Sequence, residues 1–260
     1  TENSDIDQIG VEKILKHLYS FSEKRGHDSS GIAVVRNKKI SIHKRAVPAS
    51  KFIKTKTYKS LISDENNINA IIAHARMETN GSFAKNTNNQ PVCKDGLITI
   101  HNGIIVNDEK LWELDSSLKR KYDVDTEVFN SLINLFIKKE NNFSIAIEKA
   151  LSLLIGSYSF ATIFENYNYL LLATNTGSLY YIKDDKFFLF ASEFEFLNSL
   201  KKKYLKILNH LEVNQLKAGE SILVNIDTLD IFNLKEIESK KVDNLKRQIE
   251  MVEDIKVETT

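Results

Sequence analysis

Apolar segments of strand length stand on both sides of a single block of helical periodicity. The segments before the block are GIAVVR, KISIHKR, INAIIAHAR and LITIHNGII, and those after it are SYSFATIF, YLLLAT, LYYIK and KFFLFA. Within the block, residues 107–155, apolar residues recur every three or four positions, which predicts two adjacent helices. A doubly wound fold would instead alternate strands with helices. The order therefore predicts an α+β domain with layered antiparallel sheets.

The two ends of the chain differ from this strand-rich middle. Apolar residues at positions 11, 14, 15 and 18 predict an amphipathic helix that ends near Lys24. From Asn233 onward the chain is highly charged and has no Gly, Pro or aromatic residue, although apolar residues at 242, 245, 249 and 252 fit one helical stripe. We expect one domain over residues 1–232 and a charged helical linker or tail over residues 233–260 that leads towards a partner domain.

The balance of charge and the cysteine content exclude several classes of protein. The 36 basic and 35 acidic residues are spread along the chain and give no basic patch for nucleic acid. No apolar run approaches the ~20 residues that a membrane helix needs, and the first ten residues do not resemble a secretion signal. Cys93 is the only cysteine, which is typical of a protein of the reducing cytoplasm.

Two polar segments adjoin the predicted strands in the first half of the chain. Residues 25–31, RGHDSSG, follow the first helix, and a helix cap with a glycine turn explains them adequately. Residues 73–81, AHARMETNG, place Arg76 just past a strand. An arginine there can bind a carboxylate through two parallel hydrogen bonds, although a surface arginine at a strand end is the better interpretation of this segment in isolation.

Two more polar segments flank the start of the helical block. Residues 101–105, HNGII, contain Asn102-Gly103, which is either the turn of a β-hairpin or an oxyanion hole made of a side-chain amide and a backbone N–H. Residues 124–127, VDTE, open a helix, so Asp125 is either an N-cap or a carboxylate that holds a substrate ammonium group. The local sequence of neither segment is enough to choose between the structural and the functional interpretation.

The four segments taken together, in this order, resemble the glutamine amidotransferase domain of class II enzymes. Glucosamine-6-phosphate synthase, amidophosphoribosyltransferase and asparagine synthetase carry similar domains. The resemblance extends from about Val11 to about Ile226 and includes GSYSF at 156–160, ASEFEFLN at 191–198 and LKAGE at 216–220. It implies the four-layer αββα sandwich of antiparallel sheets that is typical of N-terminal-nucleophile hydrolases.

The resemblance also assigns roles to individual residues. Arg76 is expected to bind the α-carboxylate of glutamine, and Asp125 its α-ammonium group. Asn102 and Gly103 are expected to form the oxyanion hole. Thr79, Asn80 and Gly81 are expected to line the pocket, and Arg25 with the loop after it is expected to support the amino-terminal end of the chain. Met77 and Asn80 depart from the sugar-phosphate synthase, which has Trp and His at these positions.

The nucleophile of the family is an N-terminal cysteine, whose free α-amine, with a pKa of about 8, serves as its base. The given sequence begins with Thr1, followed by ENSDIDQ, which is too polar for the buried strand that holds a nucleophile. We expect a segment on the order of five to ten residues, with that cysteine, to precede Thr1. Cys93 is expected to be an incidental thiol in a variable loop.

The function implied is hydrolysis of L-glutamine to glutamate and ammonia, with no cofactor or metal. Members of the family pass the ammonia to a synthase domain or subunit, and neither nucleic acid nor a membrane is an expected partner. The resemblance leaves homo-oligomers open. The alternative is a catalytically inactive domain that serves glutamine sensing, assembly or regulation.

Overall fold

The computed structural model describes residues 9–37, 39–77, 82, 84–140, 142–234 and 257–259. Its helices are α2 (Val11–Ser22), α3 (Ala49–Phe52), α4 (Lys56–Ile62), α5 (Asp108–Trp112), α6 (Thr126–Glu140), α7 (Phe143–Ser152), α8 (Phe194–Lys203) and α9 (Leu205–Leu208). Short 3₁₀ turns lie at Glu65–Asn67 and Asn86–Asn88. Its strands are β1 (Ser29–Arg36), β2 (Lys39–Arg45), β3 (Ile68–Arg76), β4 (Val92–Lys94), β5 (Leu97–Ile105), β6 (Gly156–Phe164), β7 (Tyr169–Thr174), β8 (Leu179–Lys183), β9 (Phe188–Ala191), β10 (Asn214–Leu216), β11 (Glu220–Asn225), β12 (Ile231–Asn233) and β13 (Val257–Thr259).

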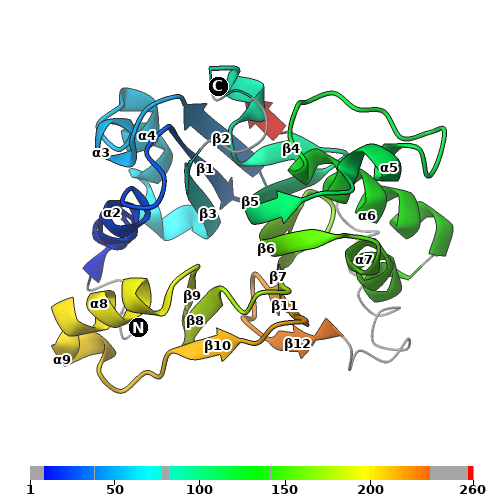
Figure 1. Ribbon diagram of the computed structural model, residues 1–260. Helices are drawn as coiled ribbons and strands as arrows, with labels where there is room; N and C mark the ends of the chain where they lie inside the picture. The colour runs from blue at the N-terminus through cyan, green and yellow to red at the C-terminus, as the bar shows by residue number, and fades with distance from the viewer. Residues whose placement is uncertain are drawn as a thin grey trace.

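Two large sheets form the centre of the molecule (Figure 1). The six-stranded sheet has the order β12-β11-β7-β6-β5-β4, and every neighbouring pair in it is antiparallel. The four-stranded sheet has the order β13-β2-β1-β3, in which β13 pairs with β2 in parallel and the other pairs are antiparallel. A separate three-stranded sheet has the order β10-β8-β9. Apart from the short β13 pairing, the predicted antiparallel pattern is confirmed.

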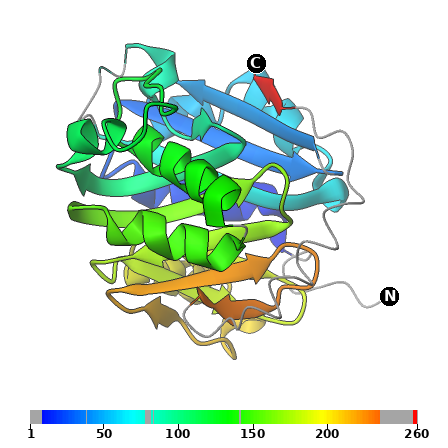
Figure 2. The ribbon, with the colours of Figure 1, turned by 90° about the vertical axis from the view of Figure 1, so that its right-hand side faces the viewer.

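Apolar side chains stack these elements into layers. One core lies between the two large sheets and includes Ala33, Ile42 and Ile72 from one sheet and Ile98, Ile163, Leu172 and Ile222 from the other. A second core joins the six-stranded sheet to α6 and α7, which lie across its outer face (Figure 2). A third joins the four-stranded sheet to α2, α3 and α4. The molecule is therefore an αββα sandwich, as predicted.

The strands predicted after Gly156 divide between two sheets instead of forming one meander. β7 pairs with β6 and β11, whereas β8 pairs with β9 and β10. The chain leaves the large sheet at Thr174, whose Oγ1 accepts hydrogen bonds from the backbone N–H of Thr176 and Gly177. Gly177 has a φ of 75°, which redirects the chain at little steric cost. The turn chemistry, and not the apolar pattern, separates β7 from β8.

The predicted tail is only partly within the described residues. β12 ends at Asn233 and Leu234 is buried, while residues 235–256, on which the expected helical stripe falls, lie outside the described residues. The boundary between residues 232 and 233 stays a prediction. None of the helices in the described part of the chain is long and apolar enough to cross a bilayer.

Candidate active site

Four segments that are far apart in the sequence meet at one cavity of about 1050 Å³. Its lining includes Arg76 from the end of β3, Asn102 and Gly103 from β5, and Asp125 from the start of α6. Arg25, after α2, also lines it. Thr79, Asn80 and Gly81 lie outside the described residues, so their predicted place in the pocket stays a prediction. The structure thus brings together the described residues that the sequence singled out.

Arg76 is a buried side chain and not a surface arginine. It is only 4% exposed, and its Nη1 donates to Oδ1 of Asn89 at 3.3 Å. The backbone of the same residue is fixed as well, because its carbonyl accepts from the N–H of Asp28 at 3.0 Å. A guanidinium held in this way at the wall of a cavity can receive a carboxylate bidentately.

Asn102 and Gly103 lie inside β5 and do not form a hairpin turn. β5 pairs with β6 without interruption from Leu97 to Ile105, so this alternative is wrong. The hydrogen bonds of the long sheet override the local turn preference of an Asn-Gly pair. Both residues are nevertheless exposed, because β5 emerges over residues 102–104, between its buried part up to His101 and the buried Ile105, and Asn102 and Gly103 line the cavity there.

His74 orients the Asn102 amide across the gap between the two sheets. Its Nε2 lies 3.0 Å from Oδ1 of Asn102. Burial lowers the pKa of His74 to about 4, so the ring is neutral at pH 7. An amide oxygen can only accept, so Nε2 carries the proton and donates. The Asn102 NH₂ group is thereby left as a donor, which is what an oxyanion hole requires.

The backbone at Gly103 admits no side chain. Its φ is 134°, and a Cβ added there would lie 2.1 Å from the carbonyl oxygen of Ser157 on the neighbouring strand. Any other residue would have to push the two strands apart. The glycine is therefore required by the close approach of β6, whichever chemistry the cavity performs.

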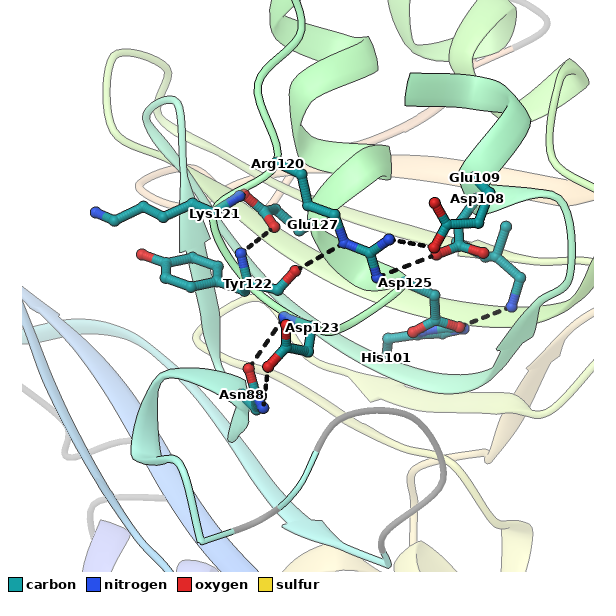
Figure 3. Close-up of polar contacts among 11 residues, drawn as sticks. Asn88, His101, Asp108, Glu109, Arg120, Lys121, Tyr122, Asp123, Asp125 and Glu127 are labelled. Atoms are coloured by element: carbon teal, nitrogen blue, oxygen red, sulfur yellow. Dashed lines mark hydrogen bonds and ion pairs between the residues drawn. The ribbon is translucent and has the colours of Figure 1, made fainter. Parts of the chain in front are cut away.

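Asp125 is held as a buried carboxylate next to His101 (Figure 3). Its Oδ2 accepts from the N–H of Ile105 at 2.7 Å, and its Oδ1 lies 3.7 Å from Nδ1 of His101. Burial alone would raise the pKa of Asp125, but His101 and the N–H groups of Ile105 and Thr126 more than offset this and lower it. The carboxylate is therefore charged at neutral pH and able to bind a cation. These contacts go beyond a simple helix cap.

A buried glutamate fixes the segment that leads into Asp125. Glu127 is fully buried, and its two carboxylate oxygens accept from the N–H of Lys121 at 2.7 Å and of Tyr122 at 2.6 Å (Figure 3). Lys94 lies 3.2 Å from the same carboxylate and balances its charge. This role could not be predicted from the segment VDTE, since a glutamate in the first turn of a helix is usually solvated.

Arg25 and Cys93 have weaker connections to the site. The Arg25 side chain is 70% exposed and forms an ion pair with Glu193. Cys93, in β4, is not among the residues that line the cavity, and burial raises its pKa to about 11, so its thiol is not activated. Its strand is paired with β5, so the stretch that holds it is ordered and not a variable loop.

Among the described residues, no group of three or more His, Cys, Asp or Glu side chains has metal-binding geometry. His74, His101 and the buried run from Asn88 to Gln90 were not predicted. His74 and His101 lie within two residues of Arg76 and Asn102, and this proximity was the only signal that the sequence carried; the run from Asn88 to Gln90 had none.

Comparison with known proteins gives an independent view of the same region. Residues 74–199 match the model of a family described as a glutamine amidotransferase domain. The chain is 29% identical over 239 residues to the glutamine–fructose-6-phosphate aminotransferase (isomerizing) of Clostridium acetobutylicum, which covers 78% of this chain and 37% of that protein. It is 30% identical over 243 residues to the protein of the same name from Buchnera aphidicola subsp. Baizongia pistaciae. That alignment covers 90% of this chain and 37% of the relative.

Among solved structures, the glutamine phosphoribosylpyrophosphate amidotransferase of B. subtilis superimposes with a TM-score of 0.64 at 21% identity. The match covers 88% of this chain and 48% of that one. At this identity the likeness shows a shared fold. The chain spans 37% of the length of the first curated relative.

Proposed function

We propose that this chain, which contains a class II glutamine amidotransferase domain with the N-terminal-nucleophile hydrolase fold, binds L-glutamine in the cavity and hydrolyses it to glutamate and ammonia. The observation that carries the proposal is the meeting of Arg76, Asn102, Gly103 and Asp125, from three separate segments, in one cavity. A single amino acid can then satisfy a cation, an anion and a pair of hydrogen-bond donors at once.

Each group has a chemical role in this proposal. The Arg76 guanidinium binds the α-carboxylate, and the Asp125 carboxylate binds the α-ammonium group. The side-chain carbonyl of glutamine lies at Asn102 and Gly103, where the oxygen becomes negative when a nucleophile attacks the carbon. Thr79, Asn80 and Gly81 complete the pocket, and Arg25 supports the amino-terminal end of the chain.

The attacking thiol is the part of the mechanism that the described residues do not supply, since Cys93 lies outside the cavity lining. By the resemblance to the family, the nucleophile is an amino-terminal cysteine that forms a γ-glutamyl thioester and releases ammonia. Water then attacks the thioester and releases glutamate, which regenerates the thiol.

The ammonia is passed to a synthase partner that aminates an acceptor. Support for this comes from the relatives named above, whose names describe transfer from glutamine to fructose 6-phosphate and whose length exceeds that of this chain. The acceptor of this protein stays open, because Met77 and Asn80 depart from the sugar-phosphate synthase within the glutamine pocket.

Calorimetry of the natural full-length polypeptide with glutamine, and an assay of glutamate formation, test the proposal. Arg76→Ala is expected to weaken binding by roughly 100-fold or more, because a buried bidentate ion pair is lost. Arg45→Ala, which removes the same charge from an exposed strand end, is the matched control and is expected to bind normally. Binding without turnover would favour the sensing alternative, and the absence of binding would overturn the proposal.

A further inference from the structure

A short polar loop connects the three segments of the candidate site that carry Arg76, Asn102 and Asp125. Residues 86–91, NTNNQP, have the composition of an exposed turn, yet Asn88, Asn89 and Gln90 are only 1%, 0% and 8% exposed. Burying three amide side chains in sequence is unfavourable unless each finds hydrogen-bond partners. The hydrogen-bond partners of the three buried amides therefore indicate the role of the loop. We call these three residues the amide run.

Each member of the amide run reaches a different part of the site. Asn88 accepts from the N–H of Asp123 at 3.1 Å and donates to its carboxylate at 3.4 Å, two residues before Asp125 (Figure 3). Asn89 accepts from Nη1 of Arg76 at 3.3 Å.

Gln90 grips the backbone next to the proposed oxyanion hole. Its Nε2 donates to the carbonyl of His101 at 2.8 Å, and its Oε1 accepts from the N–H of His101 at 2.6 Å. These are the two backbone groups of the residue immediately before Asn102. One glutamine side chain therefore takes the place of a neighbouring strand at the point where β5 emerges into the cavity.

The main chain of the loop is anchored separately from its side chains. The Lys44 ammonium, on β2, donates to the carbonyls of Asn89 at 2.7 Å and Pro91 at 2.9 Å. Gly31, on β1, lets the Gln90 carbonyl come so close that a Cβ on the glycine would lie 2.1 Å from it. The four-stranded sheet thus holds the backbone, while the amides point to the site.

We propose that Asn89 and Gln90 are positioning residues with separate effects, Asn89 on substrate affinity through Arg76 and Gln90 on the chemical step through the His101-Asn102-Gly103 backbone. Asn88 fixes the segment that carries Asp125. This inference rests on the proposed function. A purely structural loop would give variants that lose stability without any separation of kcat from KM.

The test compares kcat, KM for glutamine and Kd for glutamate in the full-length protein. For Asn89→Ala, KM and Kd are expected to rise roughly tenfold with kcat within about twofold, since one hydrogen bond to a charged group is lost in the ground state. For Gln90→Ala, kcat is expected to fall roughly tenfold or more with Kd for glutamate within about twofold, because the oxyanion donors shift.

Isosteric variants keep the test decisive if an alanine variant fails to fold. Asn89→Asp places a carboxylate on Arg76 that competes with the substrate, so KM is expected to rise without loss of kcat. Gln90→Glu can no longer donate to the His101 carbonyl while ionised. Its kcat, relative to wild type at each pH, is therefore expected to recover as the pH falls and the carboxyl group is protonated.

Thr87→Ala, an exposed change in the same loop, is the control and is expected to leave kcat and KM unchanged. An active wild type whose Asn89 and Gln90 variants change kcat and KM together, or not at all, would overturn the inference alone. A wild type that neither binds nor hydrolyses glutamine would overturn the proposed function, and the positioning roles with it.

Discussion

Two arginines line the same cavity with very different support. Arg76 is 4% exposed and contacts a buried amide, whereas the side chain of Arg25 is 70% exposed and forms an ion pair with a half-exposed glutamate. We call the side formed by Arg76, Asn102, Gly103 and Asp125, on which both charged residues are buried, the inner wall, and the Arg25–Glu193 side the outer wall. A charged side chain contributes much more binding free energy where solvent is excluded than where it is exposed. The equal charges of Arg76 and Arg25 are therefore not expected to contribute equally to binding.

The largest effect is expected at Gly103 on the inner wall. Gly103→Ala combines a φ of 134° with a Cβ only 2.1 Å from a backbone oxygen, so β5 and β6 must separate. Glutaminase activity is expected to fall by roughly 100-fold or more because an oxyanion donor moves. Stability is expected to drop by about 2 kcal/mol or more, measured by urea unfolding.

Gly219→Ala is the matched control for that change. Gly219 also has a positive φ, 82°, but an added Cβ would have no neighbour within 4 Å. Its cost is expected to be only about 1 kcal/mol, with activity unchanged. Equal losses in the two variants would show that backbone strain, and not the close approach of the strands, makes the glycine necessary.

A smaller effect is expected from the titration of His74 behind the inner wall. Burial lowers its pKa from 6.5 to about 4, so between these values the unfolded chain takes up a proton that the folded protein does not. The contribution to stability is fully present above pH 6.5 and is lost as the pH falls towards 4. The free energy of unfolding should decrease by up to about 1.4 kcal/mol per pH unit from this group.

His74→Gln isolates this contribution, because glutamine can still donate to Asn102 but does not titrate. The difference between wild type and variant in unfolding free energy should change with pH across this window. His43 and His17, whose pKa values are also lowered by burial, contribute equally to both proteins and cancel. A difference that stays constant from pH 7 to pH 4 would contradict the prediction.

The smallest effect is expected on the outer wall. Arg25→Ala removes an exposed ion pair, so stability should change by less than about 1 kcal/mol. The Kd for glutamate, measured by calorimetry, is expected to stay within about twofold of wild type. A rise as large as that of Arg76→Ala would break the distinction between the walls and make Arg25 a direct substrate ligand.

Apolar spacing predicted the eight strands β1, β2, β3, β5 and β6 to β9 and the helices α2, α6 and α7, but not short elements such as α3, α4, β10 and β12. INAIIAHAR and LITIHNGII form β3 and β5 over the expected residues. Spacing does not specify which strands pair, however. The division between β7 and β8 depends on hydrogen bonds from Thr174 and on the backbone of Gly177.

The charged and glycine members of the site could be predicted because the four segments together, in their order, resemble a known family; each segment alone also had a structural explanation. The amide run could not be predicted from the sequence. Asn and Gln in a turn-like sequence read as solvated, and only the folded chain shows that Gln90 pairs with the backbone of His101. His74 likewise gains its meaning from a residue on the other sheet, 28 positions away.

Arg76 and the Asn102–Gly103 pair lie on different sheets. Arg76 is the last residue of β3, whereas Asn102 and Gly103 lie within β5. Apolar side chains fill the space between those sheets, so the thickness of that filling sets how long a molecule must be to touch both. If glutamine binds as proposed, an amino acid one methylene shorter is expected to contact only one of the two. Enlarging or shrinking a core residue between the sheets, such as Ile72 or Ile98, is then expected to change which side-chain length the cavity accepts.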